Sequence, residues 1–497
     1  MRAGIIRFAL AQPPARSGRA HRGARASIAT SAIINNIWNM PQNWENMGKK
    51  IVVVGSGAAG MTAASLARET DREAEVTVFT EEEHIAYSPC AIPFVLEGKI
   101  KDFPSIVMHD PEFYRRERNI TVRTATTVRS VDGDKKALTL ANGETVAYDA
   151  LILATGGRVF VPPVEGADLP GVFRVRNIAD GIEIQNAMKN AKRAVVAGAG
   201  VIGLEMAVAL KRAGLDVTVV EMFSQVIPRI CDDDMARMVQ SYCEEIGIKF
   251  MLGTPLGAIK GDGKVSSVMA GLTELPCDMV IMATGVRANL DLPNMLGLDI
   301  SPLGAVRVSA TMQPYKRGRL VPSVFLAGDV VSCESAAAPG PTMSQLGSTA
   351  VRQGRVAGIN AAGGYATFPA VLSPWISQVG DMQVAGAGMS KGLAAYYGIE
   401  VVEGRASGLT RARYYPGGKP LIVKLIADRE SHRIIGAQMA GGEELNGRIN
   451  WASSAILKDV TAEEFVTSFE NAYCPSTSMV KDVVNQAAED LVKRWKD

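Results

Sequence analysis

The stretch IVVVGSGAAG, residues 51–60, decides the fold because it joins a buried strand to a glycine-rich turn. Four consecutive apolar residues are typical of a strand in a parallel sheet, and a helix rich in small residues is expected over 61–68. A second strand is expected over 75–79. This order of strand, GxGxxG turn, helix and strand is the context that a dinucleotide-binding fingerprint requires. The residues expected to contact this first dinucleotide are Gly55, Gly57, Ala58, Ala59 and Gly60.

Each glycine has a separate physical role in such a turn. The first permits the tight turn, the second lets a pyrophosphate approach the backbone, and the third lets the helix pack on the strand. An acidic residue is expected at the end of the second strand, where it binds ribose hydroxyls. Thr80 is followed there by three glutamates, and we expect Glu81 to take this role, with the register open by one position. For Glu82 and Glu83 a solvated acidic turn is an open interpretation.

The same pattern occurs again further along the chain. A strand expected over 193–197 is followed by the turn GAGVIG, a helix over 204–213 and a strand over 217–220. Glu221 closes that strand, where an acid binds ribose hydroxyls and repels a 2′-phosphate, so NADH is favoured over NADPH. The residues expected to contact this second dinucleotide are Gly198, Gly200, Val201, Ile202 and Gly203.

Each fingerprint is followed by a strand that ends in an Ala-Thr-Gly turn. The first turn contains Thr155 and Gly156, and the second ends at Gly285. Two fingerprints with matching turns indicate an internal duplication.

A later strand ends in Gly328 and Asp329. A carboxylate there can accept hydrogen bonds from the ribitol hydroxyls of a flavin, or it can serve only as a helix cap or turn residue. A helix follows over 343–360, and Ala350 within it is a further candidate contact.

Cys90 is the cysteine placed for chemistry. It lies between the two fingerprints, directly before a helix expected over 91–96, and a helix N-terminus favours thiolate over thiol. A thiolate can attack a disulfide or exchange electrons with a flavin. The alternative is a buried structural cysteine, the usual environment of a lone cysteine.

Composition and cysteine spacing exclude several classes of protein. The chain has 497 residues, of which 49 are glycines and 47% are hydrophobic, as is typical of a multidomain α/β protein. No apolar run reaches the roughly 18 residues that a membrane-spanning helix needs. The six cysteines show no CxxC or zinc-finger spacing, so no metal site is expected and a reducing compartment, the cytoplasm, is favoured.

Residues 1–46 differ from the rest of the chain. They contain six arginines and one acidic residue, Glu45, whereas 47 basic and 50 acidic residues follow. An Arg-rich segment of this kind is typical of an organelle transit peptide, but we favour upstream sequence before a start at Met40 or Met47. Either way, we expect residues 1–46 to lie outside the fold. The remaining chain is mildly acidic, which argues against nucleic-acid binding.

The predicted fold class is α/β, with two Rossmann-like domains and a C-terminal α+β dimerisation domain. A meander is expected over 120–131, 137–140 and 145–148, and C-terminal strands over 384–387, 411–415, 421–428 and 433–439. C-terminal helices are expected over 443–456, 462–468 and 478–495. The predicted domains are 47–158 with 289–367 for the first dinucleotide, 159–288 for the second, and 368–497 for dimerisation.

These motifs resemble those of the FAD-dependent pyridine nucleotide–disulfide oxidoreductases. The chain looks most like the single-cysteine branch, which contains NADH oxidases, NADH peroxidases and coenzyme A-disulfide reductases. The resemblance covers Lys49 to about Leu491. It implies that FAD binds at the first fingerprint, with Asp329 on the ribitol and Val128 near the adenine. It also implies that NAD(P)H binds at the second, with Glu205 near the nicotinamide and Cys90 on the opposite face of the flavin.

The chain departs from the family pattern near Cys90. Members with two cysteines carry them five positions apart, but Ile85 and Val95 stand at those distances here. The coenzyme A-disulfide branch has a serine four positions before its cysteine, where this chain has Ala86. That difference puts coenzyme A disulfide in doubt as the acceptor.

The C-terminal region also departs from the pattern of the large disulfide reductases. Their His-Pro-Thr stretch is replaced by residues 473–477, YCPST, without a histidine. Tyr473 resembles a tyrosine that the single-cysteine branch presents across a dimer to the partner's cysteine, and Tyr415 belongs to a second such segment. Both tyrosines can equally serve only in interface packing. Cys474 suggests a further hypothesis, an intersubunit redox pair with Cys90.

The resemblance implies a flavoprotein oxidoreductase that passes electrons from NAD(P)H through FAD and Cys90 to a small acceptor. Coenzyme A disulfide, polysulfide, oxygen and peroxide are the candidate acceptors. The alternative is a diaphorase subunit of a larger complex, exchanging electrons with iron–sulfur partners. A homodimer is expected from the family.

Overall fold

The first fingerprint belongs to a parallel five-stranded sheet with the order β21-β7-β1-β2-β3. The computed structural model describes residues 48–495, so the expected leader over 1–46 lies outside the described residues. The strands are β1 (Lys50–Val54), β2 (Glu75–Phe79), β3 (Thr121–Arg123), β7 (Ala150–Leu153) and β21 (Val324–Leu326). The sheet is therefore completed by a strand that follows the whole second fingerprint in sequence.

The second fingerprint belongs to an equivalent parallel sheet with the order β12-β11-β10-β16-β9. Its strands are β9 (Val172–Arg174), β10 (Arg193–Ala197), β11 (Asp216–Val220), β12 (Lys249–Met251) and β16 (Met279–Met282). The central strands of both sheets are continuous apolar runs because helices cover both faces of such a sheet. The predicted duplication is thus visible in the fold.

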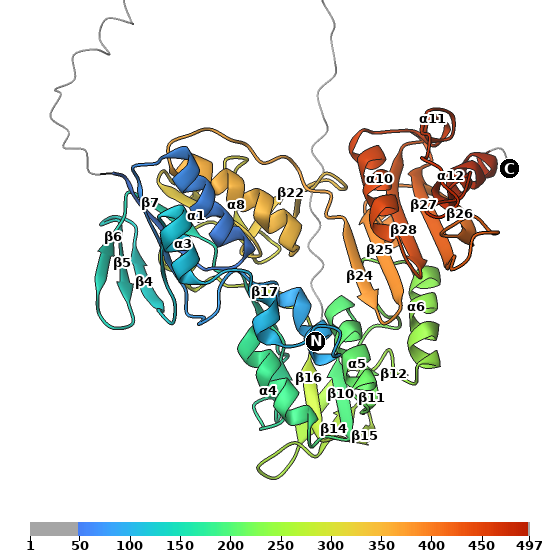
Figure 1. Ribbon diagram of the computed structural model, residues 1–497, viewed down its shortest axis with the longest axis horizontal. Helices are drawn as coiled ribbons and strands as arrows, with labels where there is room; N and C mark the ends of the chain where they lie inside the picture. Colours follow the sequence, from blue (N-terminus) through green and yellow to red (C-terminus); the bar gives the residue numbers. More distant parts are fainter. Residues whose placement is uncertain (1–47, 496–497) are drawn as a thin grey trace, which may run out of the picture. The chain divides into compact units, whose positions relative to one another are not determined.

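Two helices lie side by side over the first sheet in Figure 1, α1 (Ala58–Thr70) and α8 (Gly347–Ala361). Glycines allow their backbones to touch. A Cβ atom added at Gly354 would lie 2.3 Å from the Ala59 carbonyl oxygen, and one at Gly358 would lie 2.2 Å from the Ala63 oxygen. The first sheet and these helices share one hydrophobic core.

The C-terminal region forms an antiparallel sheet with the order β24-β25-β28-β27-β26. Its elements are β24 (Trp375–Val379), β25 (Met382–Gly388), β26 (Val401–Leu409), β27 (Pro420–Asp428), β28 (Ile434–Gly441), α10 (Leu445–Leu457), α11 (Ala462–Ser468) and α12 (Val483–Arg494). Val379, Val384 and Ala440 of this sheet belong to the hydrophobic core beneath the second fingerprint helix, α5 (Val201–Arg212). The C-terminal sheet therefore packs on α5 of the second fingerprint region within one chain.

Two predicted strands are wrong. The expected strand over 120–131 is split at Ala125, whose φ is 47°, into β3 of the first sheet and β4 (Val128–Asp132) of the meander. The meander continues with β5 (Ala137–Leu140) and β6 (Thr145–Ala147). The expected strand over 411–415 is an irregular turn, in which the Arg411 guanidinium is held by Glu443. Local apolar content cannot distinguish these cases, because tertiary contacts decide them.

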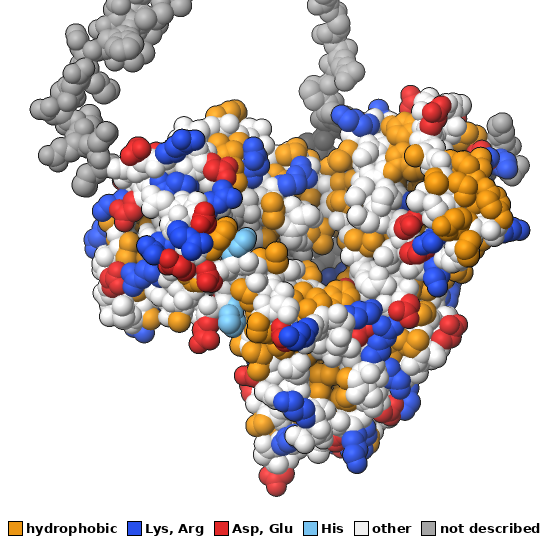
Figure 2. All heavy atoms as spheres, viewed as in Figure 1, with side chains coloured by type: hydrophobic (Ala, Val, Ile, Leu, Met, Phe, Trp, Pro, Cys, Tyr) orange, Lys and Arg blue, Asp and Glu red, His pale blue; other side chains and the backbone are white. Residues whose placement is uncertain are grey.

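Charged side chains of both signs are interspersed on the face shown in Figure 2. Hydrophobic side chains gather in that view over the α12 and β26 end of the C-terminal region. Within residues 48–495, no helix has the length and apolar character needed to cross a lipid bilayer.

Candidate functional site

The two glycine-rich turns have nearly the same geometry. Gly55 has φ of 106° and Gly198 has φ of 107°, a region that only glycine adopts readily. A Cβ atom at Gly55 would lie 2.2 Å from the Ala154 carbonyl oxygen, and one at Gly198 would lie 2.4 Å from the Ala283 oxygen. The first glycine of each turn is therefore fixed by its own backbone angle and by close contact with the neighbouring strand.

The middle glycines face open space instead. No atom lies within 4 Å of a Cβ built at Gly57 or Gly200, and these residues are the N-caps of α1 and α5. Neither helix has a side-chain cap or an acidic residue in its first turn. The free N–H donors at both N-termini are thus available to a pyrophosphate, so the residues present fit the two dinucleotides.

The acid positions of the two turns differ. Gly55 and Gly198 each donate from the backbone to the last residue of the next strand at 2.8 Å, which makes Thr80 the counterpart of Glu221. Glu221 is buried and its carboxylate accepts from Ala199 N at 2.8 Å and Phe223 N at 2.9 Å. At the first turn Thr80 accepts instead from the Ser56 hydroxyl at 3.0 Å, and Glu81 is exposed beyond it. The role of Glu81 in binding ribose stays a prediction.

The region around Asp329 brings several predicted contacts together. A Cβ at Gly328 would lie 3.2 Å from the Ala59 Cβ and 3.9 Å from the Ala350 Cβ. Gln353 on α8, which the sequence did not single out, accepts from Gly328 N at 2.9 Å. The predicted residues Gly328, Ala59 and Ala350 thus line one turn.

Arg176 is a second residue that sequence reasoning missed. Its Nη2 atom lies 3.0 Å from Asp329 Oδ2, and a Cβ at Gly156 would approach it to 2.9 Å. The guanidinium therefore lies between the Ala-Thr-Gly turn and the Gly-Asp turn. Spacing gave no signal for it, because Arg176 lies outside every motif.

Cys90 is exposed in a short 3₁₀ turn, Pro89–Ala91, followed by α2 (Ile92–Leu96). The surrounding protein partly desolvates the thiol, and this raises its pKa; the charges of Glu205 and Asp329 raise it further, whereas Ser88 and Arg176 lower it. The expectation that a helix N-terminus favours the thiolate stays a prediction, and burial of the thiol opposes it. Helix α2 has only five residues.

Glu205 lies on α5 and is close enough to Cys90 to affect the charge of its thiol. Ser377 on β24 donates to Glu205 Oε1 at 2.6 Å. Burial raises the pKa of Glu205 to about 7, and the Ser377 hydroxyl opposes that rise. A carboxyl group that titrates near neutral pH, beside Cys90 and the second fingerprint, is a candidate for proton handling.

Glu82 and Tyr87 form a hydrogen-bonded pair in the segment that leads to Cys90, with the Tyr87 hydroxyl donating to Glu82 Oε2. Burial raises the pKa of Glu82, which the Tyr87 hydrogen bond and Arg176 oppose. The solvated-turn interpretation is therefore wrong for Glu82, whereas Glu83 is exposed as that interpretation expects.

The remaining predicted contacts lie on the loops around the two turns. Residues 125 and 126 donate to the backbone oxygens of Glu82 and Thr80 at 3.1 and 2.7 Å, which holds the start of β4 and Val128 near the end of β2. Thr155 Oγ1 donates to Asn289 O at 3.1 Å. Gly285 has φ of 115° and open space at its Cβ position, and Ile202 at the start of α5 is exposed.

The C-terminal tyrosines lie on two adjacent loops. The hydroxyls of Tyr414 and Tyr473 are 2.6 Å apart, and Tyr415 is partly exposed beside them. Cys474 is exposed, and the Ser476 hydroxyl, 3.3 Å from its sulfur, lowers the pKa of its thiol. A role of these residues at the Cys90 of a partner subunit stays a prediction.

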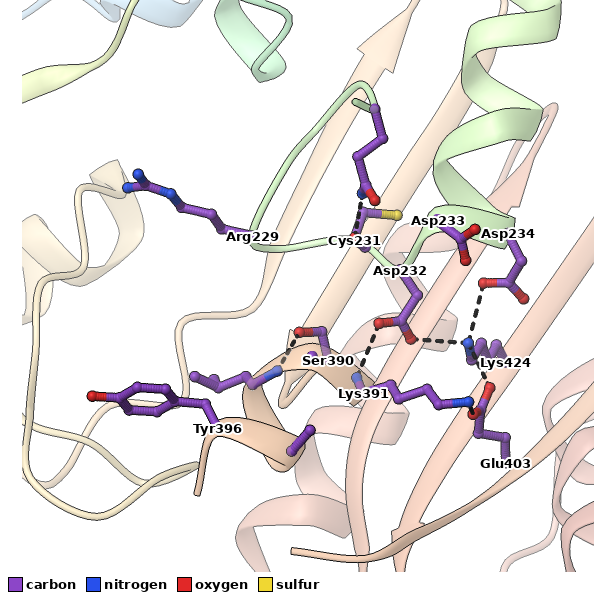
Figure 3. Close-up of a pocket in the computed structure, with 14 residues that line it drawn as sticks. Arg229, Cys231, Asp232, Asp233, Asp234, Ser390, Lys391, Tyr396, Glu403 and Lys424 are labelled. Carbon is purple, nitrogen blue, oxygen red and sulfur yellow. Dashed lines mark hydrogen bonds and ion pairs between the residues drawn. The ribbon is translucent and has the colours of Figure 1, made fainter. Parts of the chain in front are cut away.

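A cavity of about 1070 Å³ lies where the second fingerprint region meets the C-terminal sheet (Figure 3). Lys424, 3% exposed, contacts Asp232 at 2.9 Å, Asp234 at 3.1 Å and Glu403 at 2.7 Å. Its pKa stays above the ordinary value despite burial, because these carboxylates hold its charge. This network links α6 (Asp233–Glu245) to the C-terminal sheet, and every charge in it is paired.

Comparisons with known proteins cover the same regions. Residues 49–354 match the family described as pyridine nucleotide-disulphide oxidoreductase, and residues 377–483 match its dimerisation domain. A Methanocaldococcus jannaschii protein named NADH oxidase is 46% identical over 90% of this chain and 99% of its own length. A Pyrococcus horikoshii protein named NAD(P)H coenzyme A polysulfide/persulfide reductase is 31% identical over 88% of this chain and 97% of its own.

A solved structure gives the same result. The NAD-dependent persulfide reductase from A. fulgidus matches with a TM-score of 0.86 and 31% identity, over 90% of this chain and 84% of that one. The chain therefore belongs to the pyridine nucleotide-disulphide oxidoreductase family, and it is an FAD-dependent NAD(P)H oxidoreductase with a dimerisation domain.

Proposed function

We propose that this enzyme uses NAD(P)H to reduce a small sulfur acceptor, a disulfide or polysulfide, through Cys90. The observation that supports this is the position of the Cys90 thiol. It is exposed, and residues of both nucleotide-binding regions, Asp329 and Glu205, act on its pKa. Cys231, Cys243, Cys277 and Cys333 are buried, and burial holds their thiol pKa values at about 11 or 12.

FAD, when bound, supplies the chemistry that takes two electrons from NAD(P)H and releases them to an acceptor. The chain supplies binding and proton control. The free N–H donors of α1 and α5 would hold the two pyrophosphates, and Asp329 would accept hydrogen bonds from the ribitol. Glu205 can hold or release a proton near neutral pH beside the Cys90 sulfur.

The sulfur chemistry balances with Cys90 alone. The Cys90 thiol releases its proton to solvent, and the resulting thiolate attacks one sulfur of an acceptor RS–SR′, forms a Cys90–SR disulfide and expels R′S⁻. Two electrons that originate from NAD(P)H then cleave this bond, which returns the Cys90 thiolate and releases RS⁻. With one further proton from solvent, NAD(P)H and RS–SR′ give NAD(P)⁺, RSH and R′SH. No second cysteine of the same chain is needed.

Oxygen is the second candidate acceptor. The M. jannaschii relative carries the name NADH oxidase, whereas the P. horikoshii relative and the A. fulgidus structure are named for persulfide or polysulfide reduction. An oxidised Cys90 sulfenic acid would serve the oxygen reaction in place of the mixed disulfide.

The test compares Cys90→Ser with Cys474→Ser, because these are the two exposed cysteines. We expect anaerobic NADH titration of the wild type to produce a long-wavelength thiolate–flavin absorbance band that Cys90→Ser lacks and Cys474→Ser retains. Turnover with polysulfide and coenzyme A disulfide should fall by more than about a hundredfold in Cys90→Ser. Equal turnover of all three proteins with every acceptor would disprove the role of Cys90.

The C-terminal residues supply the finer proposals. In a homodimer, Tyr473 and Tyr415 would approach the partner's Cys90, and Cys474 would pair with it reversibly. Intact mass without reductant after mild oxidation should then show a covalent dimer that Cys474→Ser cannot form.

Turnover only with artificial dyes would favour the diaphorase subunit of a larger complex instead. The absence of disulfides among the six cysteines supports a reducing compartment such as the cytoplasm.

A further inference from the structure

We propose that a groove at the far edge of the first sheet binds a small organic phosphate. The groove encloses about 630 Å³, within the usual range for small-molecule sites. It lies between the β4–β5 turn at 133–136, the hairpin of β19 (Tyr315–Lys316) and β20 (Arg319–Leu320), and the start of β21. We call it the hairpin groove.

The hairpin groove is separate from the dinucleotide sites. Tyr148 and Ser323 line the groove. Tyr148 lies two residues before β7, and Ser323 lies directly before the parallel strand β21. Thr155 and Asp329 lie just beyond the opposite ends of those strands, at Leu153 and Leu326. The length of β7, about 13 Å at the usual rise per residue, lies between the groove and the fingerprint edge.

The groove is positively charged in a chain whose remainder is slightly acidic. Four cations line it, Lys136, Lys316, Arg317 and Arg319, against one acid, Asp134. None of the four has an ion-pair partner among residues 48–495. The turn of the hairpin is held in place by Asp299, which accepts from Arg317 N and Gly318 N at 2.7 Å each. Unpaired cations on a fixed hairpin are suited to a multivalent anion.

A second observation points to a ligand. Tyr148 is only 3% exposed, and its hydroxyl has no hydrogen-bond partner. A buried polar group without a partner costs free energy, so its presence needs an explanation. Burial raises the pKa of Tyr148, so the phenol stays a neutral donor. An oxygen atom of a bound anion would satisfy this hydroxyl in the same groove that the four cations line.

The walls of the groove indicate the kind of anion. Leu320, 48% exposed, and Val321 and Pro322 follow the cationic hairpin directly. A ligand whose phosphate group binds the cations and whose apolar or aromatic part packs on Leu320 would use both surfaces. A lipid headgroup offers the same chemistry, but the buried Tyr148 donor favours a small soluble ligand that enters the groove.

The experiment uses the full-length FAD-loaded enzyme with saturating NAD⁺, which occupies the nucleotide site. Phenyl phosphate is titrated by calorimetry. We expect Arg319→Ala to weaken its binding by about tenfold, because a charge-assisted contact is lost. Tyr148→Phe should weaken binding severalfold without lowering the thermal midpoint, because the hydroxyl makes no hydrogen bond in the free protein. Arg72→Ala removes an exposed charge outside the groove and should leave binding unchanged.

Three results would overturn the proposal. The first is equal weakening by Arg72→Ala and Arg319→Ala, which would indicate a net-charge effect. The second is unchanged binding in Tyr148→Phe. The third is binding of phosphatidylglycerol vesicles but not of phenyl phosphate, which would assign the hairpin to a lipid surface.

Discussion

The two nucleotide-binding turns share one backbone geometry but have different supports. At the first turn, α1 is backed by α8 through glycine contacts with Ala59 and Ala63. At the second turn, α5 is backed by the C-terminal sheet through the Glu205–Ser377 hydrogen bond. Thr62 stands on α1 where Glu205 stands on α5, because each lies seven positions after the first glycine of its fingerprint. The duplication therefore produced two binding turns with the same backbone. Only the turn that packs against the C-terminal sheet has a buried carboxyl group, Glu205, that titrates near neutral pH.

The largest expected effect comes from the same substitution in both turns. Gly55→Ala and Gly198→Ala each place a Cβ within 2.4 Å of a carbonyl oxygen at a φ that alanine avoids. Gly55→Ala should yield protein that lacks flavin absorbance at 450 nm. Its free energy of unfolding should fall by more than about 3 kcal/mol. Gly198→Ala should stay yellow but lose reduction by NADH. Loss of flavin in both variants would contradict the independence of the two turns.

The second effect concerns the support of the second turn. Lys424→Met leaves the buried Asp232 without its cation, and breaking a buried charge pair costs about 3–5 kcal/mol. Urea unfolding should show this loss, while the flavin content before unfolding stays at the wild-type level. Lys458→Met, an exposed change in the same C-terminal region, is the control and should alter stability by less than about 0.5 kcal/mol.

A smaller effect depends on pH. Burial raises the pKa of Glu205 from 4.5 in the unfolded chain to about 7 in the folded protein. Between pH 4.5 and pH 7 the folded protein therefore keeps a proton that the unfolded chain has released. This contribution to stability is full below about pH 4.5 and declines as pH rises through 7. As the pH rises from 5 to 8, the free energy of unfolding of Glu205→Gln should therefore increase by about 2 kcal/mol relative to that of the wild type. Thr62→Ala should show no such pH dependence in the same thermal unfolding series.

Ser377 provides an independent check of the same carboxyl group. The Ser377 hydroxyl lowers the pKa of Glu205, so Ser377→Ala should move the pH midpoint of NADH-dependent flavin reduction upward. A structural role alone would change the rate equally at all pH values. An unshifted midpoint would show that the Ser377 hydrogen bond does not control this proton.

The smallest effect tests the acid positions. Thr80→Val removes the partner of the buried Ser56 hydroxyl and should cost about 1 kcal/mol in stability without changing the preference for NADH. Glu221→Gln should instead raise the NADPH to NADH ratio of kcat/KM severalfold, because a carboxylate repels the 2′-phosphate. Reversed outcomes would show that Thr80 and Glu221 are not counterparts.

Sequence predicted the parts of the site whose signal is local. The glycines of both turns and Asp329 follow from short motifs, because backbone angle and close approach fix residue type within a few positions. Arg176, Gln353 and Ser377 were missed, since each reaches the site from a distant segment and belongs to no motif. The raised pKa of the Cys90 thiol was missed for the same reason, because burial, its largest cause, and the approach of Glu205 and Asp329 come only with folding.

The late arrival of β21 has a consequence for synthesis on the ribosome. Val324–Leu326 pairs with β7 and carries the chain to Asp329, so the first-made turn stays unfinished until nearly two-thirds of the polypeptide has emerged. The second turn has all five strands of its sheet by Met282 and can close earlier. A nascent chain arrested near residue 320, with its last residues still inside the ribosome, should therefore protect its second nucleotide-binding region from proteases before its first.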